Sequence, residues 1–189
     1  MRTTTELRTE ILAAARVEFA RHGLAGARID RIARAAHASK ERLYAHFRDK
    51  ETLFREVLAA DAAAFYRAAT PRPEAVEEFV GDIYDLACRR PEHLRMIDWA
   101  RLEGFALGAP ELDGQPLPAH AIAAIGEAQA AGRVDTAWRP DDLLVLLFAI
   151  GLAWAHLPDP GAITGDPEIL AHRRAVAVEA AGRLISPRG

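Results

Sequence analysis

Along most of this chain, apolar residues recur every three or four positions, which is the spacing of one face of an α-helix. The first such stripe consists of Leu7, Ile11, Ala15 and Phe19. No convincing run of alternating β-branched and aromatic residues interrupts the pattern, so we expect an all-α fold. About nine helices are predicted, at residues 4–22, 28–35, 40–46, 49–70, 74–88, 91–107, 119–131, 140–157 and 167–185.

Polar residues and glycines mark several ends of these helices. Ser39, Asp49 and Asp166 each precede a predicted helix, where a short polar side chain accepts a hydrogen bond from a backbone N–H. Gly23 and Gly132 follow predicted helices, where glycine tolerates the left-handed conformation of a C-terminal cap.

Charge divides the chain into a basic N-terminal part and an acidic remainder. The first 55 of the 189 residues hold 12 Lys and Arg against 7 Asp and Glu, a net charge of +5. The other 134 residues hold 12 basic and 20 acidic groups, a net charge of −8. Because Lys and Arg that neutralise phosphates dominate non-specific affinity for DNA, the basic part is a candidate nucleic-acid surface. The alternative is that these residues form ordinary solvated helix faces.

The composition favours a soluble, cytoplasmic protein. The single Cys88 excludes an internal disulfide framework and fits a reducing compartment. The N-terminal residues are polar and lack the apolar region of a signal peptide. The most apolar stretch, residues 143–157, is too short for an ordinary membrane span, which needs about 20 residues. We therefore expect no membrane partner.

The sequence carries no convincing signature of an enzyme or a metal protein. It lacks the nucleophile-elbow, phosphate-loop and dinucleotide-binding motifs. Glu168 and His172 stand four residues apart, which is the best metal-ligand spacing in the chain, but they lie on an expected surface or interface. We expect no catalysis, no metal and no cofactor.

The segment 27–54 carries the clearest functional signal. It predicts two short helices joined by a tight turn, with a third helix directly behind them. Helices this short are unstable alone, because nucleation is costly and only tertiary packing offsets it. A pair of this kind, near a terminus and rich in Arg, is typical of a helix-turn-helix that reads DNA.

The same segment resembles a known family. The matching positions are Ile32, Ala33, Ser39, Lys40, Leu43, Tyr44, His46, Phe47, Lys50 and Leu53, preceded by Phe19 and Gly23. This pattern, over roughly residues 7–55, is similar to the DNA-binding domain of the tetracycline-repressor (TetR) family. The resemblance implies a three-helix helix-turn-helix domain at residues 1–48 and a larger helical effector-binding and dimerisation domain at 49–189. The helix that starts at residue 49 would link the two.

Two positions depart from the family pattern. His37 occupies the turn between the two short helices, where the family usually has Gly. A positive φ in that turn costs a non-glycine residue about 1 kcal/mol, although His tolerates it better than most residues. Ala27 and Arg28 stand where the family favours Ser or Thr. The first short helix therefore has no evident N-terminal cap. In place of a hydroxyl, Arg28 could contact the DNA backbone or a base edge.

The resemblance assigns DNA-contacting roles around the second short helix, to which we add Arg28 from its place at the start of the first. The expected DNA-binding residues are Arg28, Ser39, Lys40, Glu41, Arg42, Tyr44, His46 and Lys50. Glu41 and Arg42 are expected to read base edges, because Arg pairs with guanine and Glu accepts from cytosine. Tyr44 and Lys50 are expected to hold phosphates and to set register rather than sequence. For Tyr44, packing in the core is an equal alternative.

The last two long helices are expected to pair two copies of the chain. The first of them is apolar nearly all round, so it must be buried on more than one side. In the TetR family such helices form a four-helix bundle between subunits, which would place two recognition helices ~34–36 Å apart. The expected interface residues are Leu147, Ile150, Trp154, Val176 and Leu184. The alternative is that both helices close a monomeric core.

Aromatic and sulfur-containing residues form a candidate effector pocket, because such side chains line ligand sites. They are Tyr84, Cys88, Met96, Trp99, Phe105 and Trp154, together with one polar residue, Glu103. The same residue types also build ordinary helical cores, which is the alternative at each position. A carboxylate at Glu103 would need a polar partner if it is buried, so its position is the most informative.

These features predict a homodimeric transcriptional regulator, most simply a repressor that leaves a palindromic operator when a small molecule enters the C-terminal domain. The expected partners are double-stranded operator DNA, an unknown small-molecule effector and a second copy of the chain. The alternatives are a helical binding protein that acts through protein partners, and a regulator without a small-molecule ligand.

Overall fold

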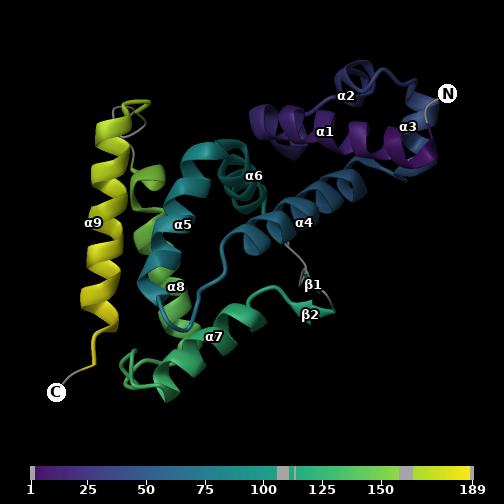
Figure 1. The fold of residues 1–189 in the computed structure, drawn as a ribbon. Helices are drawn as coiled ribbons and strands as arrows, with labels where there is room; N and C mark the ends of the chain where they lie inside the picture. The colour runs from purple at the N-terminus through teal and green to yellow at the C-terminus, as the bar shows by residue number, and fades with distance from the viewer. Residues whose placement is uncertain (1–2, 106–110, 113, 158–163, 188–189) are drawn as a thin grey trace. The chain divides into compact units, whose positions relative to one another are not determined.

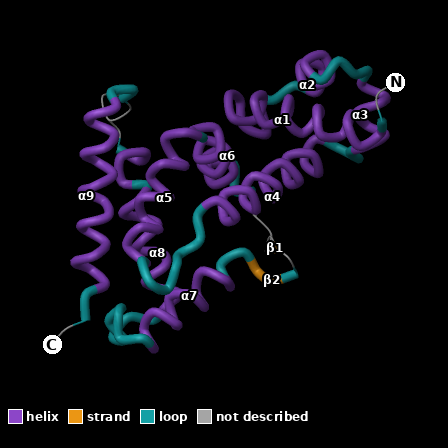
Figure 2. The backbone as a smooth tube through the Cα atoms, in the orientation of Figure 1, coloured by secondary structure: helices purple, strands orange, loops and turns teal. Residues whose placement is uncertain are grey.

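The computed structural model of the chain describes residues 3–105, 111–112, 114–157 and 164–187. Helices dominate these residues, as Figures 1 and 2 show. The helices are α1 (Thr4–Gly26), α2 (Ile29–Ala35), α3 (Lys40–His46), α4 (Lys50–Ala68), α5 (Val76–Arg89), α6 (Pro91–Leu102), α7 (Ala119–Ala130), α8 (Pro140–Gly151) and α9 (Pro167–Ile185), with a 3₁₀ helix η1 (Ala153–His156) after α8. The all-α prediction is confirmed for the described part of the chain.

One small hairpin departs from the all-helical prediction. Strands β1 (Glu111–Leu112) and β2 (Gln115–Pro116) pair with each other, and Gly114 takes a positive φ of 77° in the turn between them. Strands of two residues are too short to show the alternation that identifies a strand in a sequence.

The chain forms two compact units, of which the first contains the N-terminal helices. It consists of Met1–Ala64 and Arg90–Leu112, so it combines α1, α2, α3 and the larger part of α4 with α6. The stripe predicted on α1 is its core, since Leu7, Ile11, Ala15 and Phe19 are all buried. The compact units follow packing rather than chain order, so the domain boundary expected at residues 48 and 49 stays a prediction.

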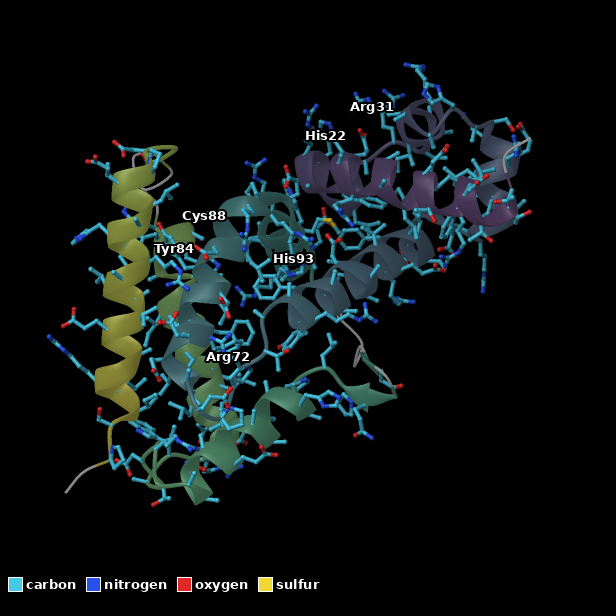
Figure 3. All side chains as sticks on the ribbon, in the orientation of Figure 1. His22, Arg31, Arg72, Tyr84, Cys88 and His93 are labelled. Carbon is cyan, nitrogen blue, oxygen red and sulfur yellow. The ribbon has the colours of Figure 1, made fainter. Side chains whose placement is uncertain are left out.

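A buried carboxylate ties three helices of the first unit together. Asp61 of α4 is 5% exposed, and its carboxylate lies 2.6 Å from a guanidinium nitrogen of Arg16 on α1. Nδ1 of His93, on α6, lies 3.8 Å from the other oxygen of Asp61 (His93 is labelled in Figure 3). A buried charge is tolerated only with such polar partners.

The second unit consists of Phe65–Arg89 and Asp113–Gly189. Within it, α5 packs against both α8 and α9 (Figure 1). A Cβ on Gly151 of α8 would stand 2.7 Å from Cγ2 of Ile83 on α5, so glycine allows these two helices to approach closely. On the other side, Arg174 of α9 forms ion pairs with Glu78 and Asp85 of α5, at 3.1 and 3.2 Å. In the described part of the chain, no helix is long and apolar enough to span a membrane.

α6 and α8 end several residues earlier than the sequence pattern predicts, whereas the ends of α4 and α7 differ by only one or two residues. α6 ends at Leu102, where the N–H of Phe105 donates to the carbonyl of Ala100 (2.8 Å) and Gly104 takes a φ of 63°. These features are those of a Schellman motif, in which a left-handed residue closes the helix. The end expected at residue 107 lies outside the described residues. α8 ends at Gly151, and the predicted continuation to residue 157 is instead the 3₁₀ helix η1.

Candidate nucleic-acid interface

The first turn of α3 presents polar and charged residues to solvent. Ser39 caps the helix as predicted, because its Oγ accepts a hydrogen bond from the N–H of Arg42 at 3.3 Å. Lys40, Glu41 and Arg42 are all exposed. Tyr44, one turn later, is 47% exposed, so its ring is not part of the core. Donors and acceptors for phosphates and base edges therefore share one short helix.

The opposite face of α3 is apolar and fixes the helix in the first unit. Leu43 and Phe47 are 0% and 1% exposed, so both are core residues. His46, the last residue of α3, is half-buried, with its ring 6.2 Å from that of Phe47. Burial on one side explains how so short a helix holds its orientation.

The turn between α2 and α3 has the left-handed residue that the sequence predicts. His37 has a φ of 48° and is the one non-glycine residue with positive φ in the part of the chain that the structure describes. Its N–H donates to the carbonyl of Arg34 (3.1 Å), and the N–H of Ala38 donates to that of Ala33 (2.9 Å). These two bonds define a Schellman motif, so His37 occupies a position that normally favours glycine.

Electrostatic contacts organise the start of α3. Nζ of Lys40 lies 2.5 Å from a carboxylate oxygen of Asp30 on α2. The hydrogen bond from Lys40 lowers the pKa of the Asp30 carboxyl, and the same bond raises the pKa of Lys40. The backbone N–H of Glu41 and the Ser39 hydroxyl lower the pKa of the Glu41 carboxyl. The lowered pKa favours the ionised Glu41 carboxylate, which accepts hydrogen bonds. The ammonium of Lys40 is already paired with Asp30, so a phosphate would compete with Asp30 for it.

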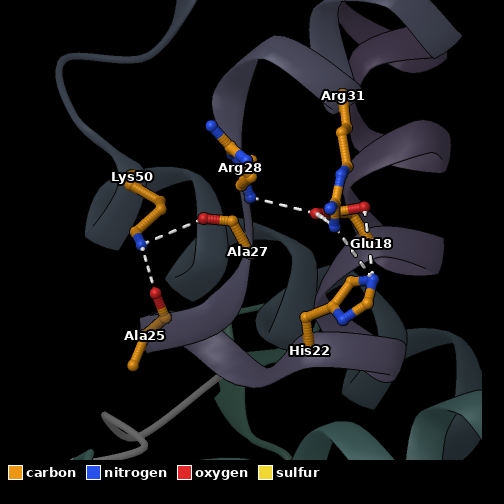
Figure 4. A network of polar contacts seen from close by, with 7 residues as sticks. All are labelled: Glu18, His22, Ala25, Ala27, Arg28, Arg31 and Lys50. Carbon is orange, nitrogen blue, oxygen red and sulfur yellow. Dashed lines mark hydrogen bonds and ion pairs between the residues drawn. The ribbon is translucent and has the colours of Figure 1, made fainter.

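Lys50 holds the connection between α1 and α2, by which we mean residues 24–28, from the break in α1 at Gly23 to the start of α2 (Figure 4). Its Nζ donates to the backbone carbonyls of Ala25 (3.1 Å) and Ala27 (3.2 Å). An ammonium group has three N–H donors, so one remains for another acceptor. Sequence reasoning missed this structural role, because both carbonyls lie more than twenty residues before Lys50 and a carbonyl leaves no mark in a sequence.

Glu18 holds the start of α2 from the other side (Figure 4). Arg28 is the N-cap of α2 but makes no side-chain cap bond, as expected for an Arg at that position. Instead its backbone N–H donates to the Glu18 carboxylate at 3.0 Å, and Arg31 donates to the same oxygen at 3.3 Å. Arg31 is therefore paired with Glu18. Arg28 keeps an exposed side chain at the point where α2 begins.

Four of the candidate effector residues lie in the first unit. Met96 is fully buried in its core, and Trp99 and Phe105 are half-buried. The Phe105 ring stands edge-on to that of Phe54, with centroids 5.1 Å apart. Glu103 accepts hydrogen bonds from the backbone N–H groups of Leu24 and Ala25. The polar partners of this half-buried carboxylate are therefore main-chain groups that directly follow the break in α1 at Gly23.

The other three candidate effector residues, Tyr84, Cys88 and Trp154, lie in the second unit. Figure 3 labels Tyr84 and Cys88. Tyr84 of α5 is 3% exposed, and its ring stands edge-on to that of Trp154 in η1, with centroids 5.6 Å apart. Burial, and then the neighbouring Cys88 thiol, raise the pKa of the Tyr84 phenol to about 12. A tyrosine phenol can both donate and accept a hydrogen bond.

The expected interface residues differ in how much surface they offer. Leu147 is 0% exposed and belongs to the core of the second unit, so it has no free surface to bury against another copy. Ile150, Trp154 and Leu184 are half-buried, and Val176 is 40% exposed. The apolar side chains that stand most clear of α8 and α9 are Val145 (67%), Ile169 (41%), Val176 (40%) and Leu146 (37%).

A hollow of about 530 Å³ lies along α1 and α2 in the first unit, but none of the candidate effector residues lines it. Its lining consists of Glu10, Ala13, Ala14, Val17, Glu18, Arg21, Arg31, Ala35 and His37. Among the described residues, no group of three His, Cys, Asp or Glu side chains is placed to hold a metal ion.

Comparison with known proteins places both parts of the chain. Residues 11–57 match the family model for bacterial regulatory proteins of the tetR family, and residues 75–183 match a model described as tetracyclin repressor-like, C-terminal domain. The "HTH-type transcriptional repressor SCO4008" of Streptomyces coelicolor is 37% identical over 152 residues, which are 78% of this chain and 77% of that protein.

Solved structures agree with the family match. The crystal structure of SCO4942 from Streptomyces coelicolor superposes with a TM-score of 0.81 at 39% identity, over 94% of this chain and 97% of that one. A TetR-family transcriptional regulator from Haemophilus influenzae, HI0893, shares the fold at 18% identity, with a TM-score of 0.70 over 95% of this chain and 98% of its own. The chain is therefore a DNA-binding transcriptional regulator of the tetR family.

Proposed function

We propose that the protein is a homodimeric repressor that binds a palindromic operator through α2, α3 and the start of α4 and is released by a small-molecule effector. The observation that carries the proposal is the first turn of α3. There a Ser39 cap and an apolar underside hold Lys40, Glu41 and Arg42 outward together. The names of its relatives support the repressor role, since SCO4008 is called a transcriptional repressor.

On the DNA, Arg42 and Glu41 read base edges in the major groove, and the other expected residues position the protein on the phosphates. Arg42 is the natural guanine reader, because its guanidinium matches guanine O6 and N7. Tyr44, 47% exposed, directs its hydroxyl to a phosphate. Arg28, Lys40, His46 and Lys50 add positive or hydrogen-bonding groups on either side of α3.

The dimer forms through the apolar faces of α8 and α9. Val145 and Leu146 on α8, and Ile169 and Val176 on α9, are the large side chains that a second copy would cover. Ile150, Trp154 and Leu184 contribute their remaining exposed edges. Twofold pairing matches the two half-sites of a palindrome, which is why the operator and the dimer are proposed together.

The effector binds in the second unit, beside Tyr84, Cys88 and Trp154. An aromatic pair that includes a phenol suits an organic molecule that carries one or two polar groups. Met96, Trp99, Glu103 and Phe105 then belong to the response of α6 rather than to direct ligand contact. The protein acts in the cytoplasm, where its operator is accessible.

A gel shift with the DNA beside its own gene tests this function. The wild-type dimer should retard that fragment and not an unrelated fragment of equal length. Failure to retard either fragment would favour the alternative in which the basic surface docks on a protein partner. Thermal-shift screening of small organic molecules, followed by release of the retarded band, then tests the effector.

A further inference from the structure

The connection between α1 and α2 is held by the carboxylate of Glu103, the C-cap residue directly after α6. Oε2 of Glu103 accepts from the N–H of Leu24 at 3.0 Å, and Oε1 accepts from the N–H of Ala25 at 3.1 Å. Both oxygens of one carboxylate are thus used on two consecutive backbone donors. Hydrogen bonds to a charged acceptor are about twice as strong as neutral ones.

Gly23 makes this contact possible. Its φ of 65° interrupts α1 and directs the next two N–H groups toward α6. A Cβ at this position would stand 2.4 Å from Oε1 of Glu103 and 2.8 Å from Cε3 of Trp99. The end of α6 therefore packs directly on the main chain of the connection, at a distance that only glycine permits.

The segment from Leu24 to Arg28 is fixed from three helices. At its start, the carboxylate of Glu103 accepts hydrogen bonds from the N–H groups of Leu24 and Ala25. Lys50 of α4 donates to the carbonyls of Ala25 and Ala27. Glu18 of α1 takes the N–H of Arg28, where α2 begins (Figure 4). The start of α2 consequently follows whatever moves these three anchors.

α6 is anchored to the same unit near its other end. His93, in the first turn of α6, lies beside the buried Asp61, ten residues before Glu103. Ten residues of helix span about 15 Å. The two contacts, with Met96 and Ala100 in the core between them, make α6 a rigid lever.

We propose that Glu103 is a positioning residue for DNA binding, which makes the position of α6 set the position of the α2 N-terminus. When Glu103 holds Leu24 and Ala25, Arg28 and the start of α2 are placed for phosphate contact. When α6 shifts, the carboxylate pulls the connection with it and this placement is lost. The inference rests on the proposed function and names the route by which an effector reaches the DNA-binding surface.

The test compares Glu103→Gln with Glu92→Gln. Both changes remove one negative charge from α6, but Glu92 is exposed in the first turn of the helix. Glutamine keeps the length of the side chain and replaces one acceptor oxygen by an NH₂ group, so one of the two bonds is lost. Hydrogen exchange at Leu24 and Ala25, circular dichroism, and operator affinity over a series of salt concentrations are measured for each.

For Glu103→Gln we expect faster exchange at these two amides and an operator Kd raised about tenfold, which corresponds to about 1.4 kcal/mol. The slope of log Kd against log salt should become shallower by about one, because one phosphate contact is lost. Glu92→Gln should behave as wild type in all three measurements. A change in slope is the signature of positioning, since a merely less stable protein binds with fewer active molecules but the same contacts.

Two results would overturn the inference. One is wild-type affinity and slope in Glu103→Gln despite rapid exchange at Leu24 and Ala25. The other is weaker binding with an unchanged slope and a matching loss of folded protein. If the wild-type protein itself bound no operator, the proposed function would fail first, and the inference would fall with it.

Discussion

Arg42 and Lys50 differ in what holds their charged groups. Arg42 is exposed on α3, whereas two backbone carbonyls occupy the ammonium of Lys50. Removal of a residue that reads a base should lower the preference for the operator sequence, whereas removal of a residue that contacts the DNA backbone should lower the affinity for any DNA.

Arg42→Ala should reduce the preference for operator over random DNA by about 1–3 kcal/mol, because it removes a base contact. Lys50→Ala should weaken binding to both DNAs alike and make the salt slope shallower. Fluorescence anisotropy with both DNAs measures these effects, and Arg101→Ala, exposed on α6, is the charge-matched control. Equal losses on both DNAs from the Arg42 and Lys50 variants would contradict this division.

His37 tests the backbone of the turn in front of α3. With a φ of 48°, the turn disfavours any residue with a branched Cβ. His37→Val should lower the free energy of unfolding by about 1–2 kcal/mol. His37→Gly should leave it unchanged or raise it, and urea unfolding measures both. Equal stability of the two variants would show that the left-handed turn is not maintained in solution.

For individual residues, contacts between near neighbours in the chain could be predicted from the sequence, and contacts between distant residues could not. The Ser39 and Asp49 caps and the positive φ of His37 depend on neighbours within a few residues, and all three agree with the sequence interpretation. Lys50 and Glu103 bind backbone groups 23 to 79 residues away. No periodicity or composition marks such an acceptor or donor, so their structural roles appear only in the folded chain.

Among the helices, two carboxylates of α4 pair with arginines of α1 in contrasting surroundings. Asp61 is buried and pairs with Arg16, whereas Glu56 pairs with Arg8 at the surface. Burial makes the loss of a partner costly, because the remaining charge cannot return to water.

Asp61→Asn should lower the free energy of unfolding by about 1–3 kcal/mol, less than for a fully buried pair because Arg16 keeps some access to water. Glu56→Gln, the matched control on the same two helices, should cost at most about 1 kcal/mol. Chemical denaturation measures both. A larger loss for Glu56→Gln than for Asp61→Asn would contradict the assigned contacts.

Helix order was predictable from periodicity, but two helix ends and the packing partner of α6 were not. Gly104 ends α6 and Gly151 ends α8, although apolar residues continue beyond both. Met96 of α6 packs in the core of the first unit, and after the helix Glu103 binds the main chain and the Phe105 ring packs on that of Phe54. An apolar stripe identifies a buried face, but it does not identify what the face is buried against.

For the whole molecule, the proposed function requires that two chains form a dimer. Val145→Asp should give a monomer at micromolar concentration by light scattering, because it places a charge in the proposed interface. Val17→Asp is the matched control, since Val17 is an exposed valine on α1 (48%). If the Val145→Asp protein remained dimeric, the dimer interface would not lie on this face of α8.

Measurement of operator binding is the most direct test of whether the protein binds DNA sequence-specifically as a dimer. Purified protein is titrated into labelled DNA from beside its own gene, and into random DNA of equal length, at several salt concentrations. We expect saturable binding of two chains per palindrome, with an affinity at least about a thousandfold above that for random DNA. Equal affinity for both DNAs at every salt concentration, or no binding to either, would contradict this expectation.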